Sequence, residues 1–204
     1  VVDHTGRVTR GDFVVACTGS DFRLASSVLG QPSALRPVRI QALHTRPGPH
    51  TPAVPITGLP SLLSHGLGDG TLPSRPVTAR DTSVRIQVKC VPRPDGGMLI
   101  GEVLDPEDPE GFDLRERPMT EVTERLERML GAAIPDVTRR WSGTVHESME
   151  GRLWFRSAID EAVVVVGGTD ERGFTLAPAI ARDTFDWLVG GIDSGASSPG
   201  AAHS

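Results

Sequence analysis

The stretch VVVVGGTDERGFTLAPAIARDTFDWL, residues 163–188, decides the fold class. Its valine run is β-branched and uninterrupted, which is typical of a strand buried on both faces of a parallel sheet. Two glycines close this strand, and Gly173 follows the loop. A helix is predicted over 176–189, with a proline in its opening turn. A buried strand, a glycine-spaced turn and a helix in this order indicate an α/β protein.

A second apolar run lies near the N-terminus, within GDFVVACTG at residues 11–19. It has the same uninterrupted character and predicts another strand buried on both faces. A helix is predicted over 20–30, because Ser20 or Asp21 can begin it and Gly30 ends it. We therefore expect a βα segment at each end of the chain, with both strands in one sheet.

The middle of the chain changes from uninterrupted to alternating patterns. LRPVRIQALHT (35–45) predicts a half-solvated strand. SVRIQVKCV (83–91) and MLIGEV (98–103) flank the turn PRPDGG and predict an antiparallel hairpin with one wet face. The remaining expectations are short strands at 1–3 and 7–9, a loop over 47–76 with a helical turn at 60–65, a helix over 117–131, a strand over 136–148, an ambiguous segment at 153–159 and a disordered tail over 192–204.

Composition narrows the class of partner. The net charge is −5 and the pI is about 5.7, which argues against binding to nucleic acid or to an anionic membrane surface. The sequence shows neither a membrane span nor a signal peptide, so a cytoplasmic protein is expected. Cys17 and Cys90 are predicted to be buried free thiols of a reducing compartment. The histidines show no metal-ligand spacing, so no metal site is predicted.

The turn after the valine run suggests a chemistry. Glycines let the backbone approach a ligand closely, and the following helix start presents N–H groups that favour an anion. The alternative is a tight strand-to-helix turn that binds no ligand. The residues of this turn alone leave both interpretations open.

Several motifs occur together in one order: W-S-G at 141–143, then GGTDERGFTLAPAIA at 167–181, preceded by GDFVVACTGSDF at 11–22 and LRPVRIQALHT at 35–45. In this order they resemble the D-amino-acid oxidase and glycine oxidase superfamily of FAD-dependent oxidoreductases. The resemblance covers nearly the whole chain apart from the tail. The segment from 84 to 131 is similar to a bacterial subgroup linked to aminophosphonate breakdown.

The resemblance implies an α/β (α+β) fold, the C-terminal part of a two-domain enzyme. Residues 1–36 and 139–191 would belong to the FAD-binding domain, and 37–138 would form an inserted antiparallel substrate domain. The implied activity is hydride transfer from a substrate C–H next to an amine to N5 of FAD. The implied partners are a small amine or amino acid substrate and an N-terminal FAD-binding segment. The chain begins without methionine and looks like a piece of something longer, so the isolated chain is expected to be inactive.

The resemblance also suggests site residues. The expected cofactor contacts are Thr18, Gly19, Gly168, Gly173, Phe174 and Thr175, and the expected substrate contacts are His146 and Arg172. No catalytic residue is assigned, and a histidine with an ordinary structural role is the alternative for His146. Arg152 and Arg156 are further candidates to contact an anion, unless they are simply solvated.

This sequence departs from the family pattern in three ways. Asp170 and Glu171 replace inner glycines of the family loop, and two carboxylates would oppose negative charge on a reduced flavin unless they point to solvent. Val145 stands where glycine oxidase-like members carry a carboxylate-binding arginine, so a simple α-amino acid substrate is in doubt. No G-x-G-x-x-G occurs to hold the pyrophosphate of the cofactor.

Two other functions therefore stay open. The chain could be a non-catalytic fragment or partner subunit that binds no flavin. It could also be an unrelated α/β module whose 168–176 loop binds a phosphate. The oxidase interpretation makes two geometric demands: the turn must not be capped by its own side chains, and it must not face away from a crevice shared with the 14–19 strand.

Overall fold

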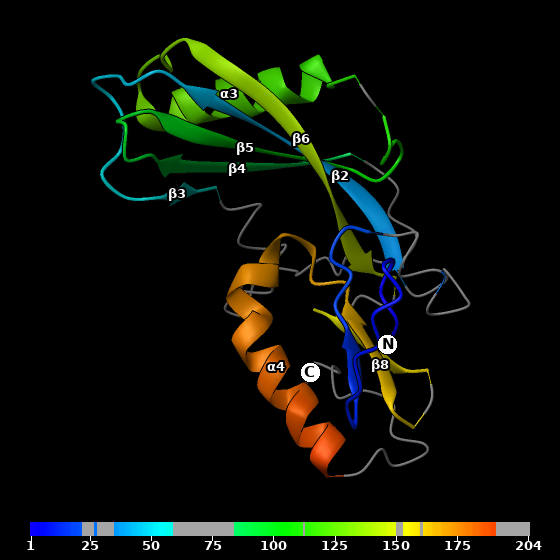
Figure 1. The fold of residues 1–204 in the computed structure, drawn as a ribbon. Coiled ribbons are helices and arrows are strands. Elements are labelled where there is room, and N and C mark those ends of the chain that lie inside the picture. The colour runs from blue at the N-terminus through cyan, green and yellow to red at the C-terminus, as the bar shows by residue number, and fades with distance from the viewer. Residues whose placement is uncertain are drawn as a thin grey trace, which may run out of the picture. The chain divides into compact units, whose positions relative to one another are not determined.

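The computed structural model describes residues 1–21, 27, 35–58, 84–111, 113–149, 153–159 and 161–190. The chain forms two compact units (Figure 1). Unit 1 comprises Val1–Pro37 with Val145–Ser204, and unit 2 comprises Val38–Thr144. The ends of the chain therefore come together in one unit around the middle segment.

A three-stranded sheet forms the centre of unit 1. Its order is β1 (Val14–Ala16), β8 (Val163–Gly167) and β7 (Phe155–Ala158). β1 runs parallel to β8, and β7 runs antiparallel to it. The expected sheet that joins both ends of the chain is confirmed, and the ambiguous segment at 153–159 contains a strand.

The valine run is buried on both faces, as predicted. Val164 and Val166 pack against Ile180 and Leu188 of helix α4 (Gly173–Val189), which lies along the sheet in Figure 1. Val165, on the opposite face, is 1% exposed. A strand without polar alternation is stable here because each face meets apolar neighbours.

Three expectations for unit 1 need correction or fall outside the described part. β1 was predicted to be buried on both faces, yet Phe13 and Val15 are 45% and 43% exposed. Among the described strands β1 is an outer one, which leaves these side chains uncovered. α4 begins three residues before the predicted start, because the 3₁₀ turn η2 (Asp170–Arg172) leads directly into it. The predicted helix over 20–30 lies outside the described residues except at residues 20 and 21 and at residue 27, which is helical, and the tail over 192–204 lies wholly outside them.

A five-stranded sheet forms unit 2, with the order β3-β4-β5-β2-β6. The strands are β3 (Ile56–Thr57), β4 (Arg85–Pro92), β5 (Met98–Asp105), β2 (Leu35–Thr45) and β6 (Val137–Ser148), of which β2 and β6 continue into the residues of unit 1. β4 and β5 form the predicted antiparallel hairpin. Within 47–76, β3 is a strand where a loop was predicted, and residues 59–83, including the proposed turn at 60–65, lie outside the described part.

Helix α3 (Glu116–Leu130) packs on this sheet and matches the predicted helix. Its stripe of Met119, Val122 and Leu126 is buried in one cluster with Val88 and Ile100 of the sheet. Gly131 ends the helix at φ +68°, a conformation that glycine adopts without strain. The 3.6-residue period of the apolar side chains was therefore sufficient to predict both the helix and its buried face.

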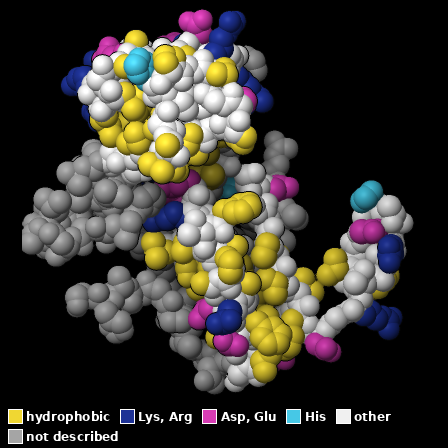
Figure 2. All heavy atoms as spheres, turned by 90° about the vertical axis from the view of Figure 1, so that its left-hand side faces the viewer, with side chains coloured by type: hydrophobic (Ala, Val, Ile, Leu, Met, Phe, Trp, Pro, Cys, Tyr) yellow, Lys and Arg dark blue, Asp and Glu magenta, His cyan; other side chains and the backbone are white. Residues whose placement is uncertain are grey.

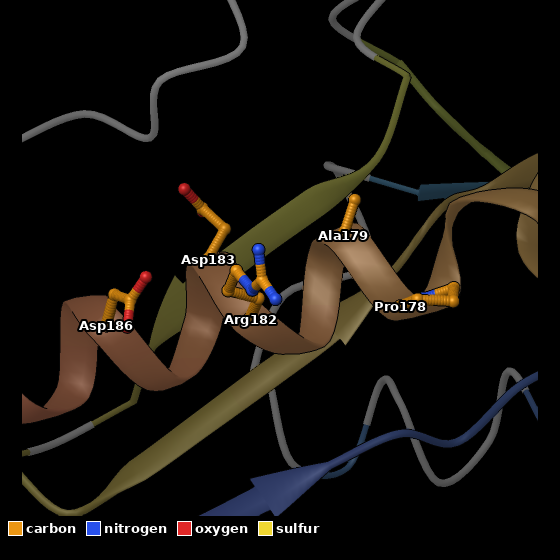
Figure 3. A pocket seen from close by; sticks show the side chains of 5 residues that line it. All are labelled: Pro178, Ala179, Arg182, Asp183 and Asp186. Carbon is orange, nitrogen blue, oxygen red and sulfur yellow. The ribbon is translucent and has the colours of Figure 1, made fainter.

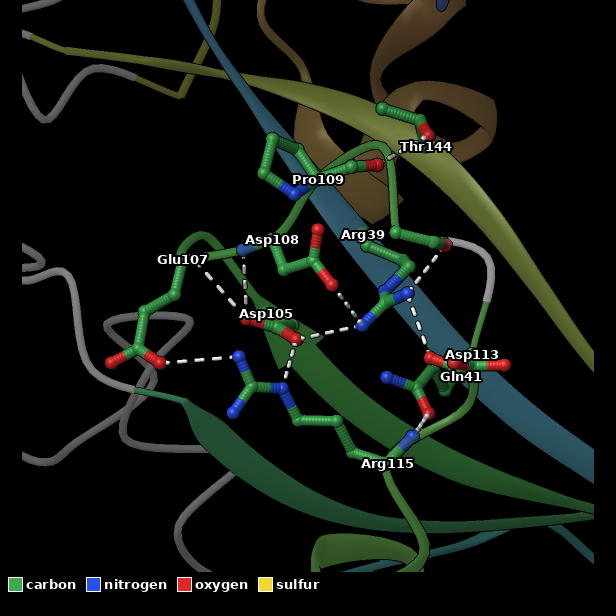
Figure 4. Close-up of polar contacts among 10 residues, drawn as sticks. Arg39, Gln41, Asp105, Glu107, Asp108, Pro109, Asp113, Arg115 and Thr144 are labelled. Carbon is green, nitrogen blue, oxygen red and sulfur yellow. Dashed lines mark hydrogen bonds and ion pairs between the residues drawn. The ribbon is translucent and has the colours of Figure 1, made fainter.

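The prediction that β2 is half-solvated is wrong. Arg39 and Gln41 are 2% and 1% exposed, because both belong to a buried polar network (Figure 4). The Arg39 guanidinium donates to Asp105 Oδ2 at 3.0 Å and to the carbonyl of Asp113 at 2.9 Å. Gln41 Oε1 accepts from the backbone N–H of Arg115 at 2.8 Å. Polar residues alternate along this strand because they hold the 105–115 loop, and they do not face water.

Neither unit contains a described helix that is long and apolar enough to cross a membrane. The two cysteines have different surroundings: Cys90 is buried in unit 2, whereas Cys17 is exposed. The expectation of two buried thiols is therefore half correct. The exposure of Cys17 has the same cause as that of Val15, since Val15 lies in the outer strand β1 and Cys17 follows it directly.

Candidate functional site

The candidate site lies in unit 1, at the edge of the sheet where β1 and β8 end. Because these strands are parallel, Thr18 and Gly19 follow β1 at the same edge at which Gly168 follows β8. In open α/β sheets, ligands bind outside the carboxyl ends of the parallel strands. The structure thus brings together residues that the sequence separates by about 150 positions, and the turn lies at the same edge as the end of β1.

The end of β6 also lies at this edge and contributes His146 and Glu147. His146 is 4% exposed, and its Nδ1 lies 2.9 Å from the carbonyl oxygen of Gly19. A carbonyl only accepts, so Nδ1 carries a hydrogen and donates it to this oxygen. The next residue, Glu147, forms an antiparallel bridge with Thr169 of the turn and an ion pair with Arg36 of β2.

The two glycines of the turn are required by packing inside the chain. A Cβ on Gly168, where φ is +69°, would lie 2.7 Å from a methyl group of Leu35. A Cβ on Gly173 would lie 2.8 Å from the hydroxyl of Thr169. These glycines are therefore explained without a ligand and do not argue for a bound ring. Gly19 differs, because at φ +57° a Cβ there would meet nothing within 4 Å.

The start of α4 fits an electron-rich group. No side-chain hydrogen bond caps the helix at Arg172, and the N-terminal end of a helix is the positive end of its dipole. Phe174 is 99% exposed, and Thr175 is exposed beside it. Open backbone at Gly19 and a helix start without a side-chain cap therefore lie at the same edge of the sheet, where an electron-rich group could be accommodated.

Asp170 is the unusual residue of this turn. Its side chain is 9% exposed and its backbone has φ +58°, which few residues other than glycine, asparagine and aspartate adopt. Burial, together with the adjacent carboxyl group of Glu171, raises the pKa of Asp170 to about 8. The carboxyl of Asp170 does not point to solvent, and its raised pKa means that the uncharged form is favoured here more than in an exposed aspartate.

The arginines that were predicted to contact an anion have different surroundings in the structure. Arg172 is partly buried, and its guanidinium lies 3.5 Å from Asp170 Oδ2. Arg156 is neither solvated nor at the site: it is stacked between Trp154 and Trp187 and pairs with Asp183 at 2.8 Å. Arg152 lies outside the described residues.

The sequence interpretation missed Glu147 and Arg36 as members of this edge. Glu147 is adjacent to His146 in β6, and alternation along the strand gave no reason to single it out. Arg36 pairs with it across 111 residues, a separation at which a single sequence carries no signal.

A pocket of about 460 Å³ lies elsewhere, on the surface of α4 (Figure 3). Pro178, Ala179, Arg182, Asp183 and Asp186 line it, and none of the predicted site residues is among them. Hydrophobic side chains also gather on this face of unit 1 (Figure 2). Over the described part of the chain, no group of three histidine, cysteine or acidic side chains is placed to hold a metal ion.

Comparison with known proteins identifies the class. A family model described as FAD dependent oxidoreductase, DAO, matches residues 1–187. The chain belongs to this family. Its α/β fold is that of about half of a D-amino-acid oxidase-like enzyme, as the resemblance of the motifs implied.

Solved structures of enzymes share the fold of this chain. L-proline dehydrogenase from P. horikoshii matches with a TM-score of 0.61 and 16% identity over 92% of this chain and 45% of that one. Iminodiacetate oxidase from Chelativorans sp. BNC1 matches with a TM-score of 0.57 and 15% identity over 97% and 47%. Glycine oxidase from Bacillus cereus matches with a TM-score of 0.56 and 18% identity over 87% and 43%.

A sequence relative covers a shorter region. The tRNA 5-methylaminomethyl-2-thiouridine biosynthesis bifunctional protein MnmC of Maricaulis maris is 35% identical over 98 residues, which are 48% of this chain and 16% of that protein. The chain thus spans less than half the length of each of these relatives.

Proposed function

We propose that this chain is the C-terminal part of an FAD-dependent oxidoreductase that oxidises a small amine or amino acid. The observation that carries the proposal is the family match over residues 1–187. The geometry of the site supports it, because the ends of two parallel strands and an uncapped helix start meet at one edge of the unit 1 sheet. In this proposal, the residues of unit 1 belong to the FAD-binding domain and those of unit 2 to the substrate domain.

The chain's own residues would hold the flavin end of the cofactor. Thr18 and Gly19 offer open backbone, and the start of α4 at Gly173, Phe174 and Thr175 offers N–H groups. Gly168 acts indirectly, since its packing on Leu35 sets the path of the turn. FAD, when bound, would accept a hydride from the substrate carbon next to the amine. The helix start would stabilise negative charge on the electron-rich edge of the cofactor.

His146 and Arg172 would act on the substrate side only indirectly. The ring of His146 is oriented by the carbonyl of Gly19, and Arg172 lies beside Asp170. We infer that both residues position the turn more than they bind substrate. Since Val145 cannot pair with a carboxylate, the group that selects the substrate must come from another residue.

The proposed substrate class follows from the relatives and from Val145, which stands where glycine oxidase-like members carry a carboxylate-binding arginine. The matched structures are named for glycine, L-proline and iminodiacetate, each an amine next to a carboxylate-bearing carbon. We propose an amine substrate for this chain and include an aminophosphonate among the compounds to test, because part of the sequence resembles that subgroup.

The experiment compares the chain alone with a complemented protein, meaning this chain co-expressed with the N-terminal half of a family member that carries G-x-G-x-x-G. We expect the complemented protein to be yellow and to release peroxide with one of glycine, proline or 2-aminoethylphosphonate. We expect the chain alone to be colourless. A folded complemented protein without flavin contradicts the proposal and favours a non-catalytic partner subunit. A thermal shift of the chain with phosphate compounds, but none with flavin, favours the phosphate-binding module.

Two phenylalanines on α4 provide a matched test of the site. Phe174 and Phe185 are 99% and 65% exposed, so replacing either by alanine leaves the buried core unchanged. We expect Phe174→Ala to weaken FAD binding to the complemented protein by about tenfold, equivalent to about 1.4 kcal/mol, because a lost ring contact costs about this much. Phe185→Ala, which lies three turns away along the helix, should leave the affinity unchanged. Equal effects of the two variants in a fluorescence titration would place the flavin elsewhere.

A further inference from the structure

The face of the unit 1 sheet that carries α4 is covered over β8 but open over β1. Val164 of β8 is fully buried and packs against Ile180 and Leu188 of α4. Val15 of β1 is in register with Val164, and side chains in register on neighbouring strands point to the same face of a sheet. Val15 is nevertheless 43% exposed. The helix therefore shields β8 and leaves the neighbouring strand open.

The backbone of β1 offers an edge to a further strand. The N–H of Val14 donates to the carbonyl of Ala162 at 2.8 Å, so the backbone groups of Val14 point toward β8. Successive residues of a strand direct their N–H and C=O groups to opposite edges, so those of Val15 point away from β8. Among the described strands, none pairs with that edge of β1. Residues 13–17 also carry no charge that would keep another strand away.

Helix α4 turns an apolar row of side chains toward β1. Asp183 and Trp187 of α4 contact Arg156 of β7, so their side of the helix faces β7. β1 lies on the other side of β8. The period of about 3.6 residues directs one row of the helix to that side. Its members are apolar and exposed: Pro178, Ala181, Phe185 and Val189. Hydrophobic side chains gather on the face of unit 1 that Figure 2 shows.

Val15 and these four side chains of α4 are called the open flank here, and its form selects the kind of partner. An open edge of a parallel sheet accepts another strand, and an apolar helix row beside an uncovered strand accepts a second helix. A strand joined to an amphipathic helix supplies both. A second copy related by a two-fold axis would pair antiparallel, whereas an uninterrupted apolar strand such as β1 is typical of parallel sheets. This chain also matches less than half of each solved relative, so relatives of that length contain further segments.

We propose that the open flank is the docking surface for a strand–helix unit of the N-terminal FAD-binding segment. The strand of this unit pairs in parallel with β1, and its helix packs on Val15 and on the apolar row of α4. The inference rests on the proposed function, because that function supplies the partner segment. A strand parallel to β1 ends at the same edge as Thr18 and Gly168, so the turn that follows it would complete the candidate site.

Four lysine variants test the open flank in two matched pairs. Ala181→Lys changes the apolar row, and its control Ala179→Lys is exposed on another side of the same helix, since residues two apart do not share a helix face. Val15→Lys changes β1, and its control Val91→Lys changes a valine of β4 that is 39% exposed. All four side chains are exposed in the chain alone, so its urea unfolding should change little in each variant.

The measurement is the amount of this chain that co-purifies with a tagged N-terminal half in the complemented protein. We expect a complex with one copy of each polypeptide for the wild type, Ala179→Lys and Val91→Lys. Ala181→Lys and Val15→Lys should each lower the recovered complex by at least about tenfold, because docking would bury the new charge without a partner. Equal recovery from all four variants, or no complex with the wild type, would overturn the docking surface.

Analytical ultracentrifugation of the chain alone tests the other occupant, a second copy. We expect a monomer. A dimer that Ala181→Lys dissociates and Ala179→Lys does not would overturn the proposal and assign the open flank to self-association.

The colour of the complex separates this inference from the proposed function, because assembly and flavin binding are measured independently. A colourless complex that Ala181→Lys and Val15→Lys disrupt supports the docking surface and contradicts the proposed function. A yellow complex that both variants leave intact supports the proposed function and overturns the docking surface.

Discussion

At the scale of single residues, Asp105 shows how a buried charge is held. Its side chain is fully buried, and Oδ2 accepts from both Arg39 and Arg115 (Figure 4). Burial alone would raise its pKa, but the hydrogen bonds from the two arginines outweigh burial and hold the pKa below 3.8. The ionised Asp105 therefore contributes its full stabilisation of the folded chain above pH 4. This contribution is lost as the pH falls through the lowered pKa of Asp105.

Asp105→Asn should destabilise the chain by about 3 kcal/mol at pH 7, because it leaves the buried Arg39 with only the exposed Asp108, at 3.4 Å, as a counter-charge. The control is Glu107→Gln, since Glu107 pairs with Arg115 at an exposed position and should contribute less than about 1 kcal/mol. Urea denaturation at pH 7 and pH 3 measures both. The gap between wild type and Asp105→Asn should narrow at pH 3. An equal loss in the two variants would show that the buried network contributes nothing beyond an exposed pair.

At the scale of secondary-structure elements, a comparison of two glycines distinguishes the cost of backbone strain from the cost of a steric clash. Gly131 ends α3 at φ +68° and Gly168 begins the β8–α4 turn at φ +69°, so the backbone demand is the same. A Cβ on Gly131 meets nothing within 4 Å, whereas one on Gly168 would lie 2.7 Å from Leu35. The two positions thus differ in packing alone.

Gly131→Ala should cost about 1–2 kcal/mol, the strain of a left-handed residue with a side chain. Gly168→Ala should cost about 1–3 kcal/mol more, because Leu35 has to move to make room. Both values come from urea unfolding followed by circular dichroism. If the two variants lose the same free energy of unfolding, then Leu35 moves aside without an energetic cost. Packing against Leu35 would then not set the path of the turn.

The same scale explains why α4 starts where it does. The 3₁₀ turn Asp170–Arg172 passes directly into the helix, and Gly173 is already helical at φ −51°. Gly173 was expected to be a loop glycine that admits a ligand. Its absence of a side chain instead makes room for the hydroxyl of Thr169.

At the scale of the whole molecule, the chain has two units with separate cores, and each contains one cysteine. Cys17 of unit 1 is exposed, and Cys90 of unit 2 is fully buried. Burial also raises the pKa of the Cys90 thiol, which lowers the fraction of reactive thiolate. The two thiols should therefore differ strongly in reactivity.

We expect a thiol reagent at pH 8 to modify one cysteine per chain in the native state and both after denaturation in urea. Cys17→Ser should abolish the fast reaction and leave the slow one. Intact-protein mass spectrometry counts the modified sites. Rapid modification of Cys90 in the native chain would mean that the core of unit 2 opens readily.

Local patterns were enough for much of the fold. The valine run of β8, the stripe of α3 and the β4–β5 hairpin were all predictable, because each is coded by the period of neighbouring side chains. The family was also recognisable, since short motifs in a conserved order do not require knowledge of contacts. The cofactor contacts proposed from those motifs remain predictions.

The tertiary structure alone decided which polar residues are buried. It also decided at which glycines a neighbouring side chain occupies the space that a Cβ would take. The alternating pattern of its strand predicts that Arg39 faces solvent. Its burial is explained only by its ion pair with Asp105, which is distant in the sequence. The sequence left open whether Asp170 points to solvent, and only the structure shows that its side chain is buried, which raises its pKa. Apolar burial follows a local period, whereas the environment of a charge depends on partners that lie far away in the sequence and close together in space.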